Sequence, residues 1–359
     1  VYVQDSTLGL NSIFSNNDFS NAAFAINEDT DGEIRNAIYG DLDRGLSEGD
    51  INATSEGDTI TVAGEHTDVG TAVELSDNST TLQSADQRDA IIAGPGGSGL
   101  VNISNDNIGD NPVDSVTISG ITLQPASDVN GLNTTTGDGL IDLTVTDNTF
   151  ELSGNSHGID AEGSAQGEDI VDLTISNNEF ARASEDTAYD GAIDIENYNL
   201  NDDGDVVSAD ISDNNINNAD NGINVSADDG TADNLELDID GNRMRLVENN
   251  GVGINLTVTS ASEALVDGNT ILGATDGSNA IGLNLTSTTD EVVELTNNEI
   301  SGIEDSDSDA GTGLKISGFD ASDVVTVENN ELTDNSIHID VTDTDNFDTD
   351  NIDSLVSNQ

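Results

Sequence analysis

One segment places oxygen-bearing side chains at the spacing that calcium binding requires. Residues 199–210 read NLNDDGDVVSAD, and they put Asn199, Asn201, Asp203 and Asp210 at positions 1, 3, 5 and 12, with a glycine at position 6. Calcium takes six to eight oxygen ligands, and a twelve-residue loop supplies them from these positions around a sharp glycine turn. The segment is therefore a candidate Ca²⁺ site, and the alternative is an ordinary acidic turn.

A shorter segment, NEDTDG, repeats part of this pattern with Asn27, Asp29 and Asp31. Its twelfth position is Ile38, which cannot ligate a metal, so this is the weaker candidate. The longer loop is similar to a dockerin or EF-hand loop, although Asn rather than Asp stands first and no helix pattern flanks it. Ca²⁺ is the cofactor that these spacings predict.

Groups for acid–base catalysis do not converge anywhere in the sequence. The three histidines, His66, His157 and His338, are isolated, and only seven Lys and Arg residues occur in the chain. Paired carboxylates suit glycoside hydrolysis, but a chain with 51 Asp contains such pairs throughout. We therefore assign no catalytic residue from the sequence.

Seven Asn-X-Ser/Thr sequons are candidate glycan sites if the protein is exported. About this number is expected by chance in a chain so rich in Asn, Ser and Thr. The sequon asparagines are Asn52, Asn78, Asn102, Asn133, Asn224, Asn255 and Asn284.

A repeat of about 30 residues must position all of these groups. Alternating apolar residues are followed by a small polar residue, an asparagine and another apolar residue, as in LTVTDNTF ending at Phe150. A second phrase, glycine followed by alternating apolar residues, lies between the copies. The recurring asparagines are Asn148, Asn178, Asn215, Asn242, Asn269, Asn298 and Asn330.

Short strands at a period of 20–50 residues indicate a solenoid or a propeller. The spacing varies from 27 to 37 residues, which suits a coil because a loop can lengthen while the strands stay in register. The prediction is an all-β fold, a right-handed single-stranded parallel β-helix of about nine or ten rungs. Inward residues, which include Ile175, Ile211, Ile239, Leu295 and Val327, should stack into one apolar column. Each turn asparagine should adopt the left-handed conformation and bond its neighbour.

The domain prediction is an N-terminal extension and cap over 1–55, the β-helix over 56–341, and a C-terminal cap or tail over 342–359. Within the first part, Ile34, Ile38 and Leu42 are spaced like one face of a short helix. Such a helix would cap the first coil, because a solenoid buries each repeat only on its neighbours.

The NNxI…GI phrases and the stretch from EGDTITVAG (56–64) to VTISGITL (116–123) resemble the pectate-lyase-type parallel β-helix repeat family. The resemblance covers about residues 56–341. It implies the fold and a secreted, surface or carbohydrate-active protein. It implies no catalytic set here, since nothing like the family's GHG and RIK motifs accompanies His157. The fold by itself hosts many functions.

The chain of 359 residues carries a net charge of −65, with one lysine and no cysteine. This charge repels nucleic acid and anionic membrane surfaces, and no apolar run approaches the ~18 residues of a membrane span. In molar salt the Debye length falls to ~3 Å, so repulsion between surface carboxylates is screened. The composition resembles that of secreted proteins of halophilic archaea. Because the sequence starts at Val1 without Met, we expect a mature or trimmed product.

The sequence thus predicts a secreted, non-enzymatic structural protein of a halophile, extracellular or on the cell surface. It would be a rigid rod that assembles into or decorates a filament, envelope or virion. Its expected partners are further copies of itself or cell-surface components, and a Ca²⁺-dependent adhesin is a variant of this prediction. The alternative is a polysaccharide lyase or glycoside hydrolase that acts on a polysaccharide in the lateral groove.

Overall fold

The computed structural model describes most of the chain from residue 114 onward and short stretches before it. The described residues are 2–3, 27–28, 37–39, 52–53, 59–62, 65–66, 73–75, 81–84, 90–94, 99–104, 114–135, 141–162, 170–183, 189–196, 207–226, 235–246, 251–258, 263–273, 280–287, 292–303, 311–319 and 324–342. All regular elements among them are β-strands.

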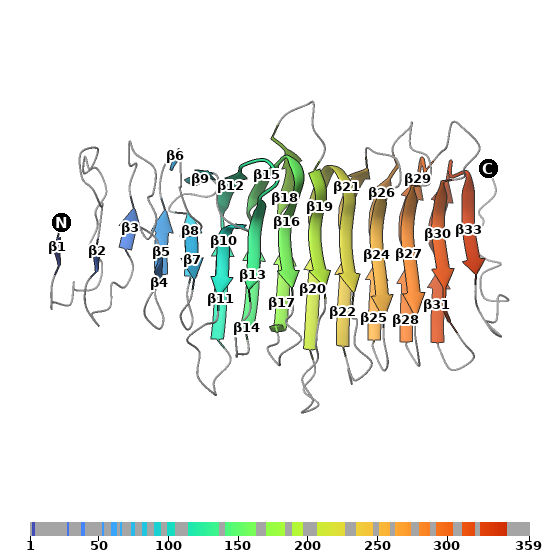
Figure 1. Ribbon diagram of the computed structural model, residues 1–359. Helices are drawn as coiled ribbons and strands as arrows, with labels where there is room; N and C mark the ends of the chain where they lie inside the picture. Colours follow the sequence, from blue (N-terminus) through green and yellow to red (C-terminus); the bar gives the residue numbers. More distant parts are fainter. Residues whose placement is uncertain are drawn as a thin grey trace.

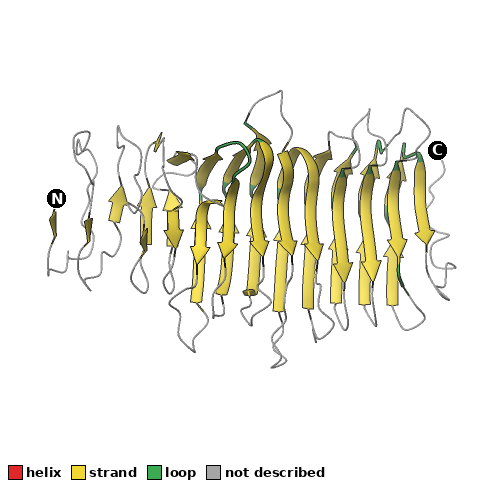
Figure 2. Cartoon of the chain, in the orientation of Figure 1, coloured by secondary structure: helices red, strands yellow, loops and turns green. Residues whose placement is uncertain are grey.

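The strands wind as a right-handed parallel β-solenoid, which confirms the predicted fold class (Figures 1 and 2). Successive strands lie side by side along one long axis, from the N-terminal strands at one end to the C-terminal strands at the other. A typical coil consists of β11 (Asp114–Ser119), β12 (Ile121–Pro125) and β13 (Asn130–Thr135). Every strand pairing in the solenoid is parallel, and each strand inside a ladder pairs with its equivalents in the coils before and after it.

The first ladder is an 11-stranded sheet with one strand from each coil, so its count exceeds the nine or ten rungs predicted. Its strands are β3 (Ala37–Tyr39), β5 (Thr59–Val62), β8 (Thr81–Ser84), β11, β14 (Ile141–Thr146), β17 (Ile170–Ser176), β20 (Val207–Ser212), β22 (Leu235–Asp240), β25 (Glu263–Asp267), β28 (Val292–Thr296) and β31 (Val324–Glu328).

The other 20 strands of the solenoid form two further ladders joined at a corner. The second ladder contains β6 (Glu65–His66), β9 (Ala90–Gly94), β12, β15 (Thr149–Leu152), β18 (Glu179–Arg182), the start of β21 (Asn215–Ser226), β23 (Arg243–Leu246), β26 (Thr270–Leu272), β29 (Glu299–Ser301) and β32 (Glu331–Thr333). The third contains β4 (Asn52–Ala53), β7 (Val73–Leu75), β10 (Gly99–Ser104), β13, β16 (Gly154–Glu162), β19 (Tyr189–Glu196), the end of β21, β24 (Val252–Val258), β27 (Ile281–Ser287), β30 (Thr312–Ser317) and β33 (Ile337–Thr342). Apart from these, β1 (Tyr2–Val3) pairs with β2 (Asn27–Glu28).

The predicted helix within residues 33–42 is wrong where the structure describes this segment. Residues Ala37–Tyr39 form β3, which pairs in parallel with β5 and begins the first ladder. A run of two or three apolar residues fits a strand as well as a helix face, and pairing with the neighbouring coil decides between them. Strands β3 and β4 both lie within 1–55, so the solenoid sheets start before residue 56.

The apolar interior matches the predicted column. Ile175, Ile211 and Ile239 lie opposite one another in successive strands of the first ladder, and Leu295 and Val327 continue the same position. All five are buried. Alternation along each strand sends these residues inward and their neighbours outward, so every coil buries its apolar face on the coils beside it.

A column of buried asparagines closes the turn between the first and second ladders. Each side-chain Nδ2 donates to a backbone carbonyl of the preceding coil, and each Oδ1 after the first accepts from the backbone N–H and Nδ2 of the preceding asparagine, whereas Asn148 Oδ1 accepts from Ile121 N. For Asn242, the Nδ2–Ile211 O distance is 2.7 Å and the distance from Asn214 N to Asn242 Oδ1 is 3.0 Å. The members are Asn148, Asn178, Asn214, Asn242, Asn269, Asn298 and Asn330.

Two details of the predicted turn are wrong. Asn214, and not Asn215, belongs to the ladder, since Asn215 is the first residue of β21 and is half-buried. The left-handed residue is the one before each ladder asparagine, for example Asp213 with φ 55° or Gly241 with φ 64°. This position turns the chain, and the asparagine that follows is free to point inward.

Glycines of the second repeated phrase stand where two coils approach closely. A Cβ on Gly253 would lie 2.5 Å from the Gly282 carbonyl oxygen and 2.7 Å from Ile271 Cγ2. Both atoms belong to the packed interior, so the position excludes any side chain. The same crowding recurs at Gly282 against Gly313, which explains why the phrase begins with glycine.

Candidate functional site

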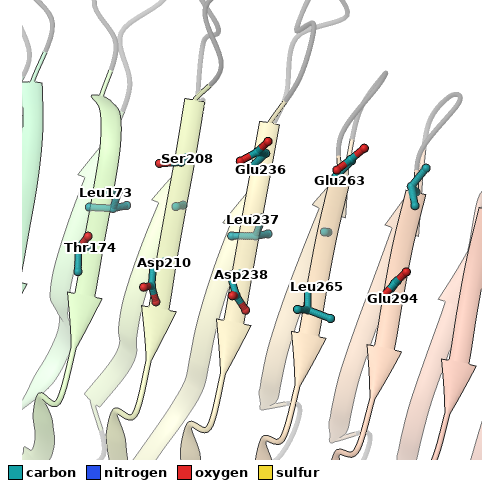
Figure 3. Close-up of a pocket in the computed structure, with 13 residues that line it drawn as sticks. Leu173, Thr174, Ser208, Asp210, Glu236, Leu237, Asp238, Glu263, Leu265 and Glu294 are labelled. Atoms are coloured by element: carbon teal, nitrogen blue, oxygen red, sulfur yellow. The ribbon is translucent and has the colours of Figure 1, made fainter.

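The outward face of the first ladder carries an acidic groove. Outward positions two residues apart form rows that cross the coils, because the register does not shift between β17 and β31. One row runs Thr174, Asp210, Asp238, Leu265 and Glu294, and the row beside it runs Asp172, Ser208, Glu236, Glu263 and Val292. All members of the two rows except Asp172 line a cavity of about 500 Å³ (Figure 3).

Carboxylates in this groove lie close enough to disturb one another. Partial burial raises the pKa of the Asp238 carboxyl above its usual 3.8, and the negative charges of Asp210, Asp240 and Asp267 raise it further. Burial also raises the pKa of Asp240, chiefly with Asp267 as its charged neighbour. A carboxyl with a raised pKa holds a proton more readily, which is the property of a general acid.

Asp210 and Asp238 form a candidate catalytic pair inside this groove. They are register partners on adjacent strands, and adjacent strands lie roughly 4.8 Å apart. Retaining glycosidases hold their two carboxyl groups at about 5 to 5.5 Å. The pair thus combines a raised pKa at Asp238 with a suitable spacing. None of the described residues that line the groove is basic. The groove therefore offers no positively charged side chain to pair with the carboxylate of an acidic sugar.

A second hollow, of about 490 Å³, lies on the outward face of the third ladder. His157 lies in it with its Nε2 atom 3.4 Å from Asp194 Oδ2 and 3.8 Å from Asp190 Oδ2. The ring lies over Gly191, where a Cβ would be 2.5 Å from His157 Cδ2. A side chain at Gly191 would displace the His157 ring, so the shape of the hollow depends on this glycine.

The sequence showed His157 only as an isolated histidine. The structure places it on strand β16 with 23% of its side chain exposed, between two carboxylates from β19. The signal that could have found this group is the register of the repeats. Aligning SHGID (156–160) with YDGAID (189–194) sets His157 opposite Gly191.

Most of the predicted calcium ligands lie outside the described residues. Asn199, Asn201, Asp203, Asp29 and Asp31 are among them, and for Asn27 only its place in β2 is described. Asp210 is described, on strand β20 among the groove carboxylates. Within the described ranges, no three His, Asp or Glu side chains come together as a metal-binding group. The loop over 199–210 therefore stays a prediction.

The sequons are brought together on the third ladder. Register partners place Asn102 beside Asn133, and Asn224, Asn255 and Asn284 beside one another. Asn52 belongs to β4 of the same ladder, and Asn78 lies outside the described residues.

Comparisons with family models, with curated proteins and with solved structures find no match to this chain. The class that its fold defines is the parallel β-solenoid. In the part of the chain that is described, no helix is long and apolar enough to cross a membrane.

Proposed function

We propose that the chain is a secreted or cell-surface structural protein of a halophile, a rigid rod without enzymatic activity. The observation that carries this proposal is the unbroken asparagine ladder from Asn148 to Asn330. Each member between these two bonds to the asparagines of the coils on either side of it and to a backbone carbonyl of the preceding coil. A rod clamped at every coil resists bending, which suits a filament, an envelope or a virion surface.

The charge of the chain supports the halophilic part of the proposal. Its −65 net charge includes only one lysine, and in the groove burial and the negative charges of neighbouring carboxylates raise the pKa of Asp238. In molar salt this repulsion is screened over ~3 Å. The faces of the rod then stay hydrated and soluble, and contacts with further copies or with cell-surface components become feasible.

Sedimentation and electron microscopy of the protein in 2–3 M NaCl test this proposal. We expect straight particles whose length grows with concentration or which join end to end, and no release of sugar from polysaccharide. Compact monomers that degrade a polysaccharide would overturn it. Calcium dependence of assembly would favour the adhesin variant.

A glycoside hydrolase is the second candidate, and the Asp210–Asp238 pair favours it. Asp238 would donate a proton to the leaving oxygen, and Asp210 would act as nucleophile or base. Reducing-sugar release from neutral polysaccharides by the wild type, lost in both Asp238→Asn and Asp210→Asn, would support it. Lyase chemistry on acidic sugars is less suited to the groove, because the anionic substrate would meet only carboxylates.

A further inference from the structure

The outward face of the third ladder carries one continuous file of amide and carboxyl side chains. From coil to coil, register partners place Asn133, Asp160, Asp194, Asn224, Asn255, Asn284 and Lys315 in this file. We name these positions the outer file. Four of the seven sequon asparagines belong to it, and a fifth, Asn102, pairs directly with its first member.

Hydrogen bonds in the outer file run in one direction. Asn284 Nδ2 donates to Asn255 Oδ1 at 2.7 Å, and Asn255 Nδ2 donates to Asn224 Oδ1 at 2.6 Å. Asn224 Nδ2 then donates to Asp194 Oδ1 at 2.7 Å. The second oxygen of Asp194 faces His157. The chain of amides therefore ends on a carboxylate, and it orients that carboxylate toward the histidine.

The atom that donates each of these bonds is the atom to which an N-linked glycan attaches. Glycan acceptors belong to surface loops, whereas these asparagines are half-buried on strands. Neighbouring members are only about 4.8 Å apart, so a sugar on one would occupy the space of the next side chain. Asn133 is also 6% exposed, which leaves no room for a bulky substituent.

We infer that Asn133, Asn224, Asn255 and Asn284 carry no glycan in the folded protein, and that Asn224, Asn255 and Asn284 form with Asp194 an outer hydrogen-bonded ladder. This ladder clamps the third sheet from the outside, as the buried asparagines clamp the corner from the inside. It also holds Asp194 against His157. The inference does not depend on the proposed function, since a rod and an enzyme both need the same sheet.

Two substitutions at one sequon distinguish a role in glycan attachment from a role in the hydrogen-bonded ladder. Asn255→Ala and Thr257→Ala both destroy the sequon Asn255–Leu256–Thr257, but only Asn255→Ala removes the ladder amide. Thr257 points outward on the same strand, so Thr257→Ala shortens an outward side chain much as Asn255→Ala does. Each variant and the wild type would be secreted from a glycosylating host, beside a control glycoprotein that reports on the host.

We expect unmodified masses for the wild-type peptides that contain Asn133, Asn224, Asn255 and Asn284. Thr257→Ala should melt at the wild-type temperature, and Asn255→Ala should melt lower by about 1–2 °C, the shift that one lost kcal/mol gives in a protein of this size. A glycopeptide at any of the four positions would overturn the inference, whether or not the variants fold. Equal melting temperatures for the two variants would also overturn it.

Discussion

Replacing Asn214 by alanine tests the buried ladder at the coil where the sequence predicted Asn215 and the structure places Asn214. The Asn214 side chain takes part in four hydrogen bonds. Its Oδ1 accepts from Asn178 N at 3.0 Å and from Asn178 Nδ2 at 3.1 Å. Its Nδ2 donates to Ile175 O at 2.8 Å and to Asn242 Oδ1 at 3.0 Å. Alanine can make none of these bonds.

The expected loss of stability follows from the polar groups that Asn214→Ala leaves without a hydrogen-bond partner. Asn178 Nδ2 keeps its bond to Val145 O, and Asn242 Oδ1 keeps the backbone N–H of residue 214. The Asn178 N–H and the Ile175 carbonyl lose this partner in the buried corner. A buried polar group without a partner costs about 1–3 kcal/mol, so Asn214→Ala should destabilise by roughly 2–6 kcal/mol.

Asn215→Ala is the matched control, because it removes the same side chain one residue later. Asn215 is half-buried on β21, and its backbone N–H to Asn178 O bond remains. Surface substitutions of this kind change stability by no more than about 0.5 kcal/mol. Urea unfolding followed by circular dichroism in 2 M NaCl would measure both variants. Equal losses, or a larger loss for Asn215→Ala, would refute the ladder as described.

Four further predictions use the same protein and methods. The melting temperature should rise steeply between dilute buffer and molar NaCl, because salt screens the −65 charge; a flat profile would remove the halophile argument. At low salt, stability should rise as pH falls from 7 toward 4, because the folded pKa of Asp238 is raised above 3.8 and the native state therefore binds its proton first. Asp238→Asn should reduce this dependence, and an unchanged profile would contradict the assignment. Gly253→Ala should lower the free energy of unfolding by about 1–3 kcal/mol, since its methyl would meet the Gly282 carbonyl at 2.5 Å. An unchanged stability would show that neighbouring coils can move apart to accept a methyl group. Calorimetry should find one Ca²⁺ fewer in the double variant Asp203→Ala/Asp210→Ala than in wild type, and equal numbers would make the 199–210 segment only a turn.

The repeat by itself determined the fold class and the interior. Ile175, Ile211 and Ile239 recur at the same place in successive copies, so they had to share one face of stacked strands, and the structure buries all three in register. Period-2 alternation is a local property of the backbone, and a repeated alternation can be stacked in few ways. The apolar column and the stacked asparagines were therefore open to prediction.

Only the tertiary structure decided which residues meet across coils on the outside. His157 gained its carboxylate partners from β19, 33 and 37 residues away, because strand register set them beside Gly191. Contacts between coils depend on loop lengths that vary from repeat to repeat, so one repeat by itself does not reveal them and the strands of neighbouring repeats must first be aligned.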